Sequence, residues 1–233
     1  MRIAVTRPQE DAAPLKAKLE ALGHRVMMTP LLTIRPRRQV TLPDLAWQAI
    51  AVTSANGIRA LPDLPHLKTI RTLTVGPQSL KAATGAGFNN AEYHGGDVNG
   101  LAAFIRGNLD PVNGPILYLS GAETAGDLEA QITASGFQCH RAIVYDAIPA
   151  SSLGATETAL RHGKVDAVML YSPRSARLWV TLVETASLTR EAAVLLHLCL
   201  SRNVAQVLPE AWAKSIAETA DEAALLALLE QSR

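Results

Sequence analysis

Aromatic residues and cysteines are scarce in this chain of 233 residues, and its charges nearly balance. Phe, Trp and Tyr make up 4% of the sequence, which is too few for the stacking platforms that bind single-stranded nucleic acid. The formal net charge of +1 provides no basic surface for DNA or RNA. The two cysteines, Cys139 and Cys199, lie in apolar stretches, so we expect buried thiols and no disulfide framework.

The sequence also lacks an apolar leader and any run of residues long enough to cross a membrane. Its first residues, MRIAVTRPQ, lead directly into an expected strand. With 48% hydrophobic residues, the chain still has the material for substantial cores. These features predict a soluble, cytoplasmic protein of one large domain or two ordinary ones. Because few exposed apolar clusters can be inferred, we expect a monomer.

The common catalytic signatures are missing as well. The sequence contains no Walker, HExxH, GxSxG or CxxC motif. Its six histidines show no ligand spacing, so we expect no metal site. Gly85 and Gly87 do not complete a dinucleotide-binding fingerprint, and they close an expected helix instead of opening one.

What the chain does contain is a repeat of itself. Residues 3–34 resemble residues 116–148, with Leu15 falling on Leu128 and Gly23 on Gly136 at the same spacing. Each copy predicts a strand, a polar turn, an amphipathic helix, a glycine stop and a second strand. Two further pairs resemble each other in the same way, namely 51–61 with 168–179 and 73–83 with 197–208. Two similar halves predict two similar lobes, and small molecules commonly bind in a cleft between lobes.

Expected strands and helices alternate along the whole chain, as in α/β folds with parallel sheets covered on both faces. We therefore expect two similar three-layer α/β/α lobes that arose by internal duplication. Residues 30–36 are expected to be extended and irregular, and Thr219 with Glu222 predicts a capping box for the last helix. The best candidate connections, 36–43 and 147–154, flank a central segment, so the lobes can be formed by the middle of the chain and by its two ends.

A hydroxyl or small polar residue recurs where the expected strands become helices. In α/β sheets such turns line the crevice at the carboxyl ends of the strands, where helix N-termini attract anions. Because Ser, Thr and Asn are also good N-caps, any single turn can serve capping alone. The whole set favours an anionic ligand, either a phosphate or a carboxylate. The candidate binding residues are Thr6, Arg7, Thr53, Ser54, Asn56, Gly76, Ser79, Ser120, Ser172, Arg174, Ser175 and Ser201.

Several pieces of the chain form a recognisable pattern in this order: VTRPQEDAAPLKAKLEALGHRVMMTPLLTI, VTSANGIRAL, LTVGPQSLKAATGAGF, LYLSGAETAGDLEAQITASGFQCHRAIVYDAI, YSPRSARLW and the tail 217–229. Through these pieces, nearly the whole chain resembles the uroporphyrinogen-III synthase family. The order and spacing of the pieces carry this resemblance, because each motif alone is weakly specific. The resemblance implies one lobe of residues 1–35 with 149–233, a second lobe of residues 37–147, and a two-stranded connector of residues 31–36 and 144–149.

The same resemblance implies a lyase that needs neither cofactor nor metal and has no nucleic-acid or membrane partner. Its substrate would be hydroxymethylbilane, a linear tetrapyrrole with an acetate and a propionate on every ring. The product would be uroporphyrinogen III, formed with loss of water and inversion of ring D through a spiro intermediate.

Individual residues match the family's motifs. Tyr145, in IVYDAI, matches the connector tyrosine that is the usual candidate to protonate the departing hydroxyl, and interdomain packing is the alternative role. Arg7 and Arg174 are the most plausible carboxylate partners by charge, although each can equally be a solvated surface arginine. The turn residues that match are Thr53, Ser54, Asn56, Gly76, Ser79, Ser172 and Ser175.

Three positions depart from the family's pattern. Residues 201–204 lack the usual glycine and threonine, Asn99 replaces a more common Ser or Thr before an expected helix of residues 101–109, and Tyr171 replaces Phe or Thr. These departures leave room for a non-catalytic relative that binds a tetrapyrrole or another anion. An unrelated two-lobed solute-binding protein is a third interpretation, which the lack of an export signal disfavours.

Overall fold

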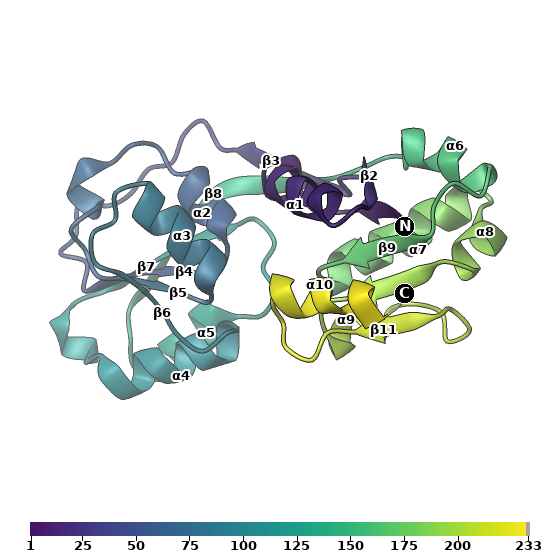
Figure 1. The fold of residues 1–233 in the computed structure, drawn as a ribbon. Coiled ribbons are helices and arrows are strands. Elements are labelled where there is room, and N and C mark those ends of the chain that lie inside the picture. Colours follow the sequence, from purple (N-terminus) through teal and green to yellow (C-terminus); the bar gives the residue numbers. More distant parts are fainter. Residues whose placement is uncertain (232–233) are drawn as a thin grey trace. The chain divides into compact units, whose positions relative to one another are not determined.

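A computed structural model describes residues 1–231 and divides the chain into two compact units (Figure 1). Unit 1 comprises Met1–Thr33 together with the chain from Ile148 onward, and unit 2 comprises Ile34–Ala147. The chain therefore enters unit 2 once and leaves it once. The two crossings lie within strands β3 (Leu32–Pro36) and β8 (Cys139–Pro149), which are neighbours in one sheet.

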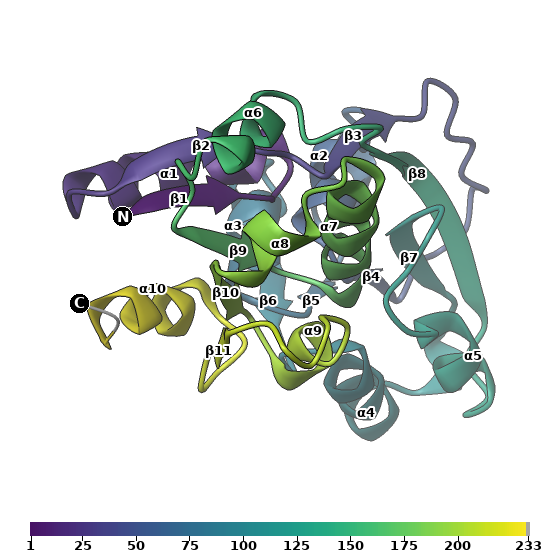
Figure 2. The ribbon, with the colours of Figure 1, turned by 90° about the vertical axis from the view of Figure 1, so that its right-hand side faces the viewer.

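Unit 1 is built on a five-stranded parallel sheet in the order β11-β10-β9-β1-β2. One apolar cluster joins the sheet to α1 and α10, and a second joins it to α6, α7, α8 and α9 (Figure 2). Its strands are β1 (Arg2–Val5), β2 (Arg25–Met28), β9 (Ala167–Leu170), β10 (Leu196–Cys199) and β11 (Lys214–Ile216). Its helices are α1 (Gln9–Ala21), α6 (Ala155–Arg161), α7 (Pro173–Thr185), α8 (Thr189–Ala193), α9 (Arg202–Ala205) and α10 (Glu222–Gln231).

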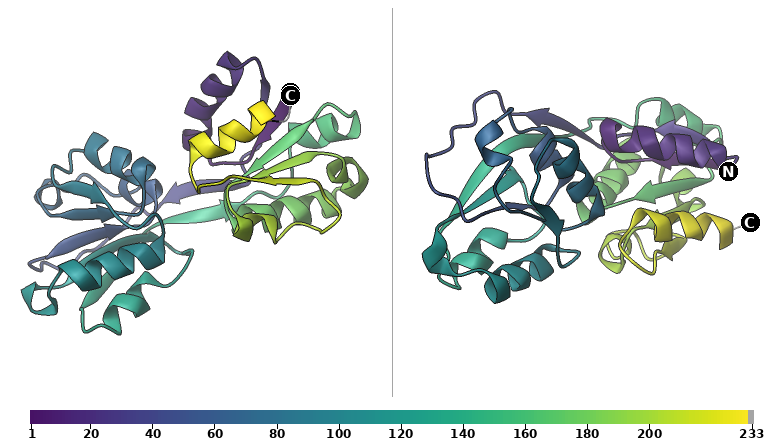
Figure 3. Two further views of the ribbon diagram at one scale, coloured as in Figure 1. Left: turned by 60° about the horizontal axis from the view of Figure 1, so that its bottom comes forward. Right: turned by 60° about the vertical axis from the view of Figure 1, so that its left-hand side comes forward.

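Unit 2 is built on a sheet in the order β3-β8-β7-β4-β5-β6, with parallel pairing from β8 to β6. Helices α2 and α3 share an apolar cluster with one face of this sheet, and α4 and α5 share another with the opposite face (Figure 3). The further strands are β4 (Ala49–Val52), β5 (Thr72–Thr74), β6 (Ala91–Tyr93) and β7 (Ile116–Gly121). The helices are α2 (Ala55–Arg59), α3 (Pro77–Gly85), α4 (Val98–Asn108) and α5 (Leu128–Thr133), with short 3₁₀ turns at Pro65–Leu67 and Pro111–Asn113.

The two sheets repeat one topology, because β8-β7-β4-β5-β6 follow the same order as β2-β1-β9-β10-β11. Helices α1 and α5 even end alike. Gly23 and Gly136 adopt left-handed φ values of 83° and 88°, and the next amide, of His24 or Phe137, donates to a carbonyl in the helix's last turn. A left-handed residue at this point favours glycine and satisfies otherwise unpaired carbonyls. The predicted α/β fold class with internal duplication is confirmed.

Two expectations about local structure need correction. The stretch 30–36 is extended, as expected, but it is not irregular, because residues 32–36 pair with β8 as strand β3. The last helix is capped by Asp221, whose carboxylate accepts the Ala224 amide at 2.8 Å, and not by Thr219. Glu222 is unavailable for a capping box because its carboxylate pairs with Arg7 at 3.1 Å and with Lys18 at 2.6 Å.

Other elements differ in extent or were not foreseen. Helix α4 begins at Val98, earlier than expected, because Asp97 accepts the Gly100 amide at 2.8 Å. Asn99 therefore lies inside the first turn of this helix and does not precede it. Strand β6 and helix α8 have no counterpart in the sequence-based expectation.

Candidate functional site

Three strands of unit 1 end at one edge of its sheet, and a predicted polar turn follows each of them. After β1, the Thr6 hydroxyl donates to the Met169 carbonyl at 2.6 Å and is buried. After β9, Ser172 and Ser175 form a reciprocal capping box at the start of α7, each side chain accepting the other's amide at 3.1 Å. Arg174 is half-buried in the first turn of that helix, and Ser201 occupies the N-cap position of α9 without a side-chain cap.

Arg7 is not the solvated surface arginine that the sequence allowed. Its side chain is 11% exposed, and its guanidinium pairs with Glu222 at 3.1 Å and with Asp11 at 3.8 Å. The same group lies 4.7 Å from the centre of the Tyr171 ring. Burial raises the pKa of the Tyr171 phenol, which therefore stays neutral beside the cation. Two carboxylates of the chain thus already balance the charge of Arg7.

Three strands of unit 2 likewise end together, as the pairing of Val52 with both Thr74 and Leu119 shows. Ser54 caps α2 by accepting the Asn56 amide at 3.3 Å. The Thr53 hydroxyl lies 3.0 Å from the Tyr118 hydroxyl, and burial raises the pKa of this buried phenol.

The turn after β5 carries two more of the predicted residues. Gly76 precedes Pro77, the first residue of α3, and a Cβ at Gly76 would meet no atom within 4 Å. Packing therefore leaves open space on this side of the turn. Ser79 is buried in the first turn of the same helix.

Tyr145 lies at the end of the β7–β8 pair and is 8% exposed. The register shifts by one residue between Ser120 and Gly121, so that Gly121 pairs with Tyr145. The Tyr145 ring packs so closely on Gly121 that an added Cβ would lie 2.7 Å from it.

Arg141, which sequence analysis did not select, also reaches this end of β7. Its Nε donates to the Ser120 Oγ at 2.8 Å, and its Nη2 donates to the carbonyls of Gly121 and Ala122 at 2.9 and 2.8 Å. No motif marks Arg141 in the sequence, because it lies within a strand and not in a turn.

The predicted residues thus form one set at the carboxyl edge of each sheet. Hydroxyls and helix N-termini dominate both sets, which suits a ligand with carboxylate groups. The set of unit 1 comprises Thr6, Arg7, Ser172, Arg174, Ser175 and Ser201. The set of unit 2 comprises Thr53, Ser54, Asn56, Gly76, Ser79, Ser120 and Tyr145.

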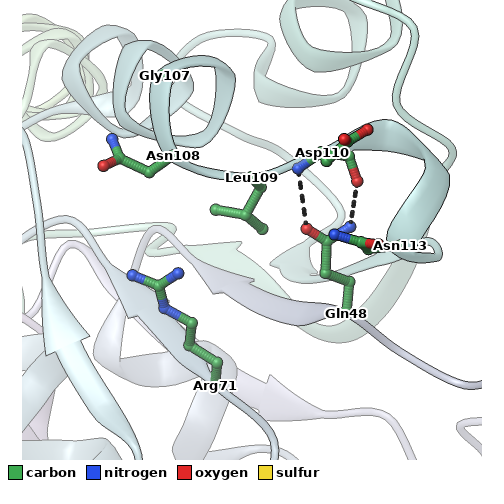
Figure 4. Close-up of a pocket in the computed structure, with 7 residues that line it drawn as sticks. All are labelled: Gln48, Arg71, Gly107, Asn108, Leu109, Asp110 and Asn113. Atoms are coloured by element: carbon green, nitrogen blue, oxygen red, sulfur yellow. Dashed lines mark hydrogen bonds between the residues drawn. The ribbon is translucent and has the colours of Figure 1, made fainter.

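A cavity of about 450 Å³ lies at the other edge of the unit 2 sheet, among residues that precede β4 and β5 and follow α4 (Figure 4). One of its polar side chains, that of Gln48, joins the segment before β4 to the loop after α4. The Gln48 amide donates to the carbonyls of Asp110 and Gly114 at 2.8 and 3.1 Å and accepts the Asp110 N–H at 3.3 Å. This cavity is therefore separate from the strand-end residues.

Within residues 1–231, no three His, Cys, Asp or Glu side chains are grouped in a way that suits a metal ion. Over the same residues, no helix has the length and apolar character needed to span a bilayer.

Duplicated parallel sheets whose strand ends carry hydroxyl-bearing turns define a class of two-unit α/β proteins. Within this class, the chain belongs to the family of uroporphyrinogen-III synthase HemD, whose family model matches residues 13–227. The resemblance found in the sequence is confirmed, and the family links the chain to porphyrin and haem biosynthesis.

Individual proteins agree with this assignment. A uroporphyrinogen-III synthase of Chlorobaculum parvum is 28% identical over 195 residues, which cover 75% of this chain and 76% of the relative. The crystal structure of uroporphyrinogen-III synthetase from Helicobacter pylori matches the whole of both chains with a TM-score of 0.70 and 18% identity. A mutant uroporphyrinogen III synthase from Thermus thermophilus matches with a TM-score of 0.59 and 18% identity, covering 100% of this chain and 98% of the other. At these identities the structural matches support the fold.

Proposed function

We propose that this protein is a uroporphyrinogen-III synthase that cyclises hydroxymethylbilane to uroporphyrinogen III with inversion of ring D. The observation that carries the proposal is the family match over residues 13–227, which includes Tyr145 and all of the polar turns except the one that contains Thr6 and Arg7. The reaction class would be that of a lyase that eliminates water and uses no cofactor. We further propose that the protein acts in the cytoplasm as a monomer.

Tyr145 is the proposed acid. Its phenol would protonate the hydroxyl of hydroxymethylbilane, which leaves as water and converts the end of the chain into a reactive azafulvene. Unaided closure at the free position of the last ring gives the symmetrical isomer. The enzyme would direct attack to the substituted carbon instead, and the resulting spiro intermediate would fragment and reclose with ring D inverted. Holding the chain in the folded geometry is therefore the main catalytic task.

The strand-end turns would perform this holding. The substrate carries an acetate and a propionate on each ring, so it presents many carboxylates to the protein. The N-termini of α3 and α7 offer backbone N–H groups and the positive end of a helix dipole. Hydroxyls at the turns add donors, among them that of Ser79 at the start of α3 and that of Thr53 before α2. Many weak contacts that act together suit a flexible polyanion better than one strong site.

A second candidate is a non-catalytic relative that binds a tetrapyrrole or another anion. Two features of unit 1 favour this second candidate. Arg7 is already paired with Glu222 and Asp11, and the side chain of Ser201 does not cap α9. Such a protein would keep the fold and the binding turns without directing ring closure.

An isomer assay separates the two candidates. Hydroxymethylbilane is incubated with the purified protein, the products are oxidised, and isomers I and III are separated by chromatography, with heat-denatured protein as the control. Isomer III in molar excess over the protein is expected. Isomer I alone, formed at the rate of the control, would contradict the synthase and leave the binding module.

A further inference from the structure

Arg141 holds the end of strand β7 through three hydrogen bonds to consecutive residues. Its guanidinium donates to the Ser120 hydroxyl and to the carbonyls of Gly121 and Ala122, at 2.8 to 2.9 Å. All three acceptors are neutral oxygens, so these contacts fix the guanidinium without cancelling its charge. A planar fork with several fixed N–H groups suits this arrangement, which the single ammonium of lysine cannot reproduce.

The β7 residues that Arg141 holds lie where the pairing of β7 with β8 shifts by one residue, and this shift sets the position of Tyr145. Pairing is regular up to Ser120, which lies opposite Ile143, but Gly121 lies opposite Tyr145. The extra residue on β8 is Val144, a β-bulge of the kind that turns a side chain in a new direction. The Ala122 amide donates to the Tyr145 carbonyl at 2.9 Å and fixes the shifted register.

The backbone at Gly121 also limits the Tyr145 ring directly. A Cβ at residue 121 would lie 2.7 Å from the ring atoms Cε2 and Cζ and 3.0 Å from the hydroxyl oxygen. The ring therefore rests on the Gly121 backbone, and any movement of that backbone moves the phenol.

We propose that Arg141 is a positioning residue for Tyr145: it holds the end of β7 that lies opposite the β8 bulge, and so it fixes the position of the phenol. The inference rests on the proposed function, since it gives Arg141 a role in the step assigned to Tyr145. A displacement of about 1 Å can reduce a rate by roughly a hundredfold, so a partial loss of support has a measurable cost.

A double-mutant cycle tests whether Arg141 acts through Tyr145. Arg141→Met keeps the length of the side chain and removes the donors, while Arg141→Lys keeps the charge and loses the fork. Either change is expected to lower kcat by about tenfold with little change in KM. In the Tyr145→Phe background, the same changes should have no further effect on kcat, because the group they position is gone. Equal losses in both backgrounds would overturn the proposal.

A second measurement does not depend on activity. Hydrogen exchange at the Ala122 amide reports directly on the bulge, and we expect Arg141→Met to accelerate it by about tenfold. The Ile116 amide, bonded to the Gln138 carbonyl at 2.9 Å at the other end of the same strand pair, should not change. Arg71→Met is the matched control: Arg71 directly precedes β5, and its loss removes an ion pair with Glu92 on β6, so both amides should stay unchanged.

The two readouts keep the proposals apart. If the wild type makes no isomer III but Arg141→Met accelerates exchange at the Ala122 amide, the proposed function fails, and the support that Arg141 gives to the end of β7 stands. If isomer III is made and Arg141→Met changes neither kcat nor Ala122 exchange, the positioning role fails and the synthase stands. If Arg141→Met does not fold, Arg141→Lys is used for both readouts.

Discussion

The ring of Tyr145 occupies the space in which a side chain on residue 121 would begin, because a Cβ added to Gly121 would lie 2.7 Å from its Cε2 and Cζ atoms. Glycine is required here by the close approach of a ring to the backbone. Since Tyr145 is the proposed acid, this contact joins the packing of unit 2 to its proposed chemistry.

The substitution Gly121→Ala tests that contact. The new methyl group must displace the ring or the backbone, and we expect a loss of about 1–3 kcal/mol in the free energy of unfolding, together with slower formation of isomer III. Chemical denaturation and the isomer assay measure the two effects. Gly107→Ala is the control, because Gly107 is exposed on α4 and a Cβ added there would have no atom within 4 Å. It should stabilise the protein by about 0.5–1 kcal/mol, and a similar gain at Gly121 would contradict the contact.

Replacing Tyr145 by phenylalanine removes the proposed proton donor and keeps the ring. Turnover should fall by about a hundredfold while the thermal unfolding midpoint changes little, since loss of one general acid typically costs that much. Tyr93→Phe provides the comparison, because this tyrosine is exposed on the edge strand β6. Wild-type turnover in the Tyr145→Phe variant would remove Tyr145 as the acid and leave it a packing residue.

His197 makes the stability of unit 1 depend on pH. The imidazole is buried, its Nε2 accepts the Trp179 N–H at 3.3 Å, and its Nδ1–H donates to the Ala213 carbonyl at 3.1 Å. Burial lowers its pKa from 6.5 to about 4. The unfolded chain therefore takes up a proton first, so the stability that the neutral imidazole contributes is present above pH 6.5 and is lost as the pH falls toward 4.

Urea titrations between pH 7 and pH 4 measure this effect. His197→Gln should flatten the dependence of the unfolding free energy on pH, at the cost of lower stability at pH 7. His66→Gln, at an exposed position, should keep the wild-type slope. An unchanged slope in His197→Gln would show that other groups cause the dependence.

Helices α4 and α10, which follow the corresponding edge strands β6 and β11, each begin after a capping aspartate. Asp97 accepts the Gly100 amide and Asp221 accepts the Ala224 amide, both at 2.8 Å. Asp97→Ala and Asp221→Ala should each destabilise the protein by about 1 kcal/mol, measured by thermal unfolding at neutral pH. Thr219→Ala should cost less, since Thr219 only donates to Asp221. A larger loss from Thr219→Ala than from Asp221→Ala would restore the predicted capping box.

The acid dependence of the same cap has a definite sign. The Thr219 hydroxyl and the Ala224 amide hold the pKa of Asp221 below its ordinary value. The contribution of this cap is therefore present above the ordinary pKa and is lost as the pH falls through the lowered one. Asp221→Asn should reduce the loss of stability in that acid range, as measured by unfolding between pH 5 and pH 2.

Much of the fold was predictable because the pattern of each repeat is strong. The strand, helix and glycine stop of 3–34 recur in 116–148, and the polar turns follow strand ends as the topology of parallel sheets requires. Strand β6 escaped prediction because its three residues, Ala91–Tyr93, form a polar edge that only pairing with β5 makes a strand. The local pattern showed strand β3 only as an extended segment, because Pro30 precedes it and Pro36 ends it, and only the family resemblance indicated a paired strand there.

The candidate site was predictable only in part. Turn residues such as Ser54 and Ser172 stand out beside their helices, but the sequence could not show that their side chains act as caps. The proximity of Arg141 to Ser120 depends on strand register, and the Gly121–Tyr145 contact depends on a one-residue bulge. Neither register nor bulge leaves a local pattern in the sequence.

The division of the chain also sets an order for folding during synthesis. Unit 2 is continuous, so all of its residues have been made once Ala147 leaves the ribosome. Strand β1, by contrast, lies between β2 and β9 in its sheet, and β9 is made only at Ala167–Leu170. Strand β1 must therefore wait, with one edge unpaired, until unit 2 and then β9 have been synthesised.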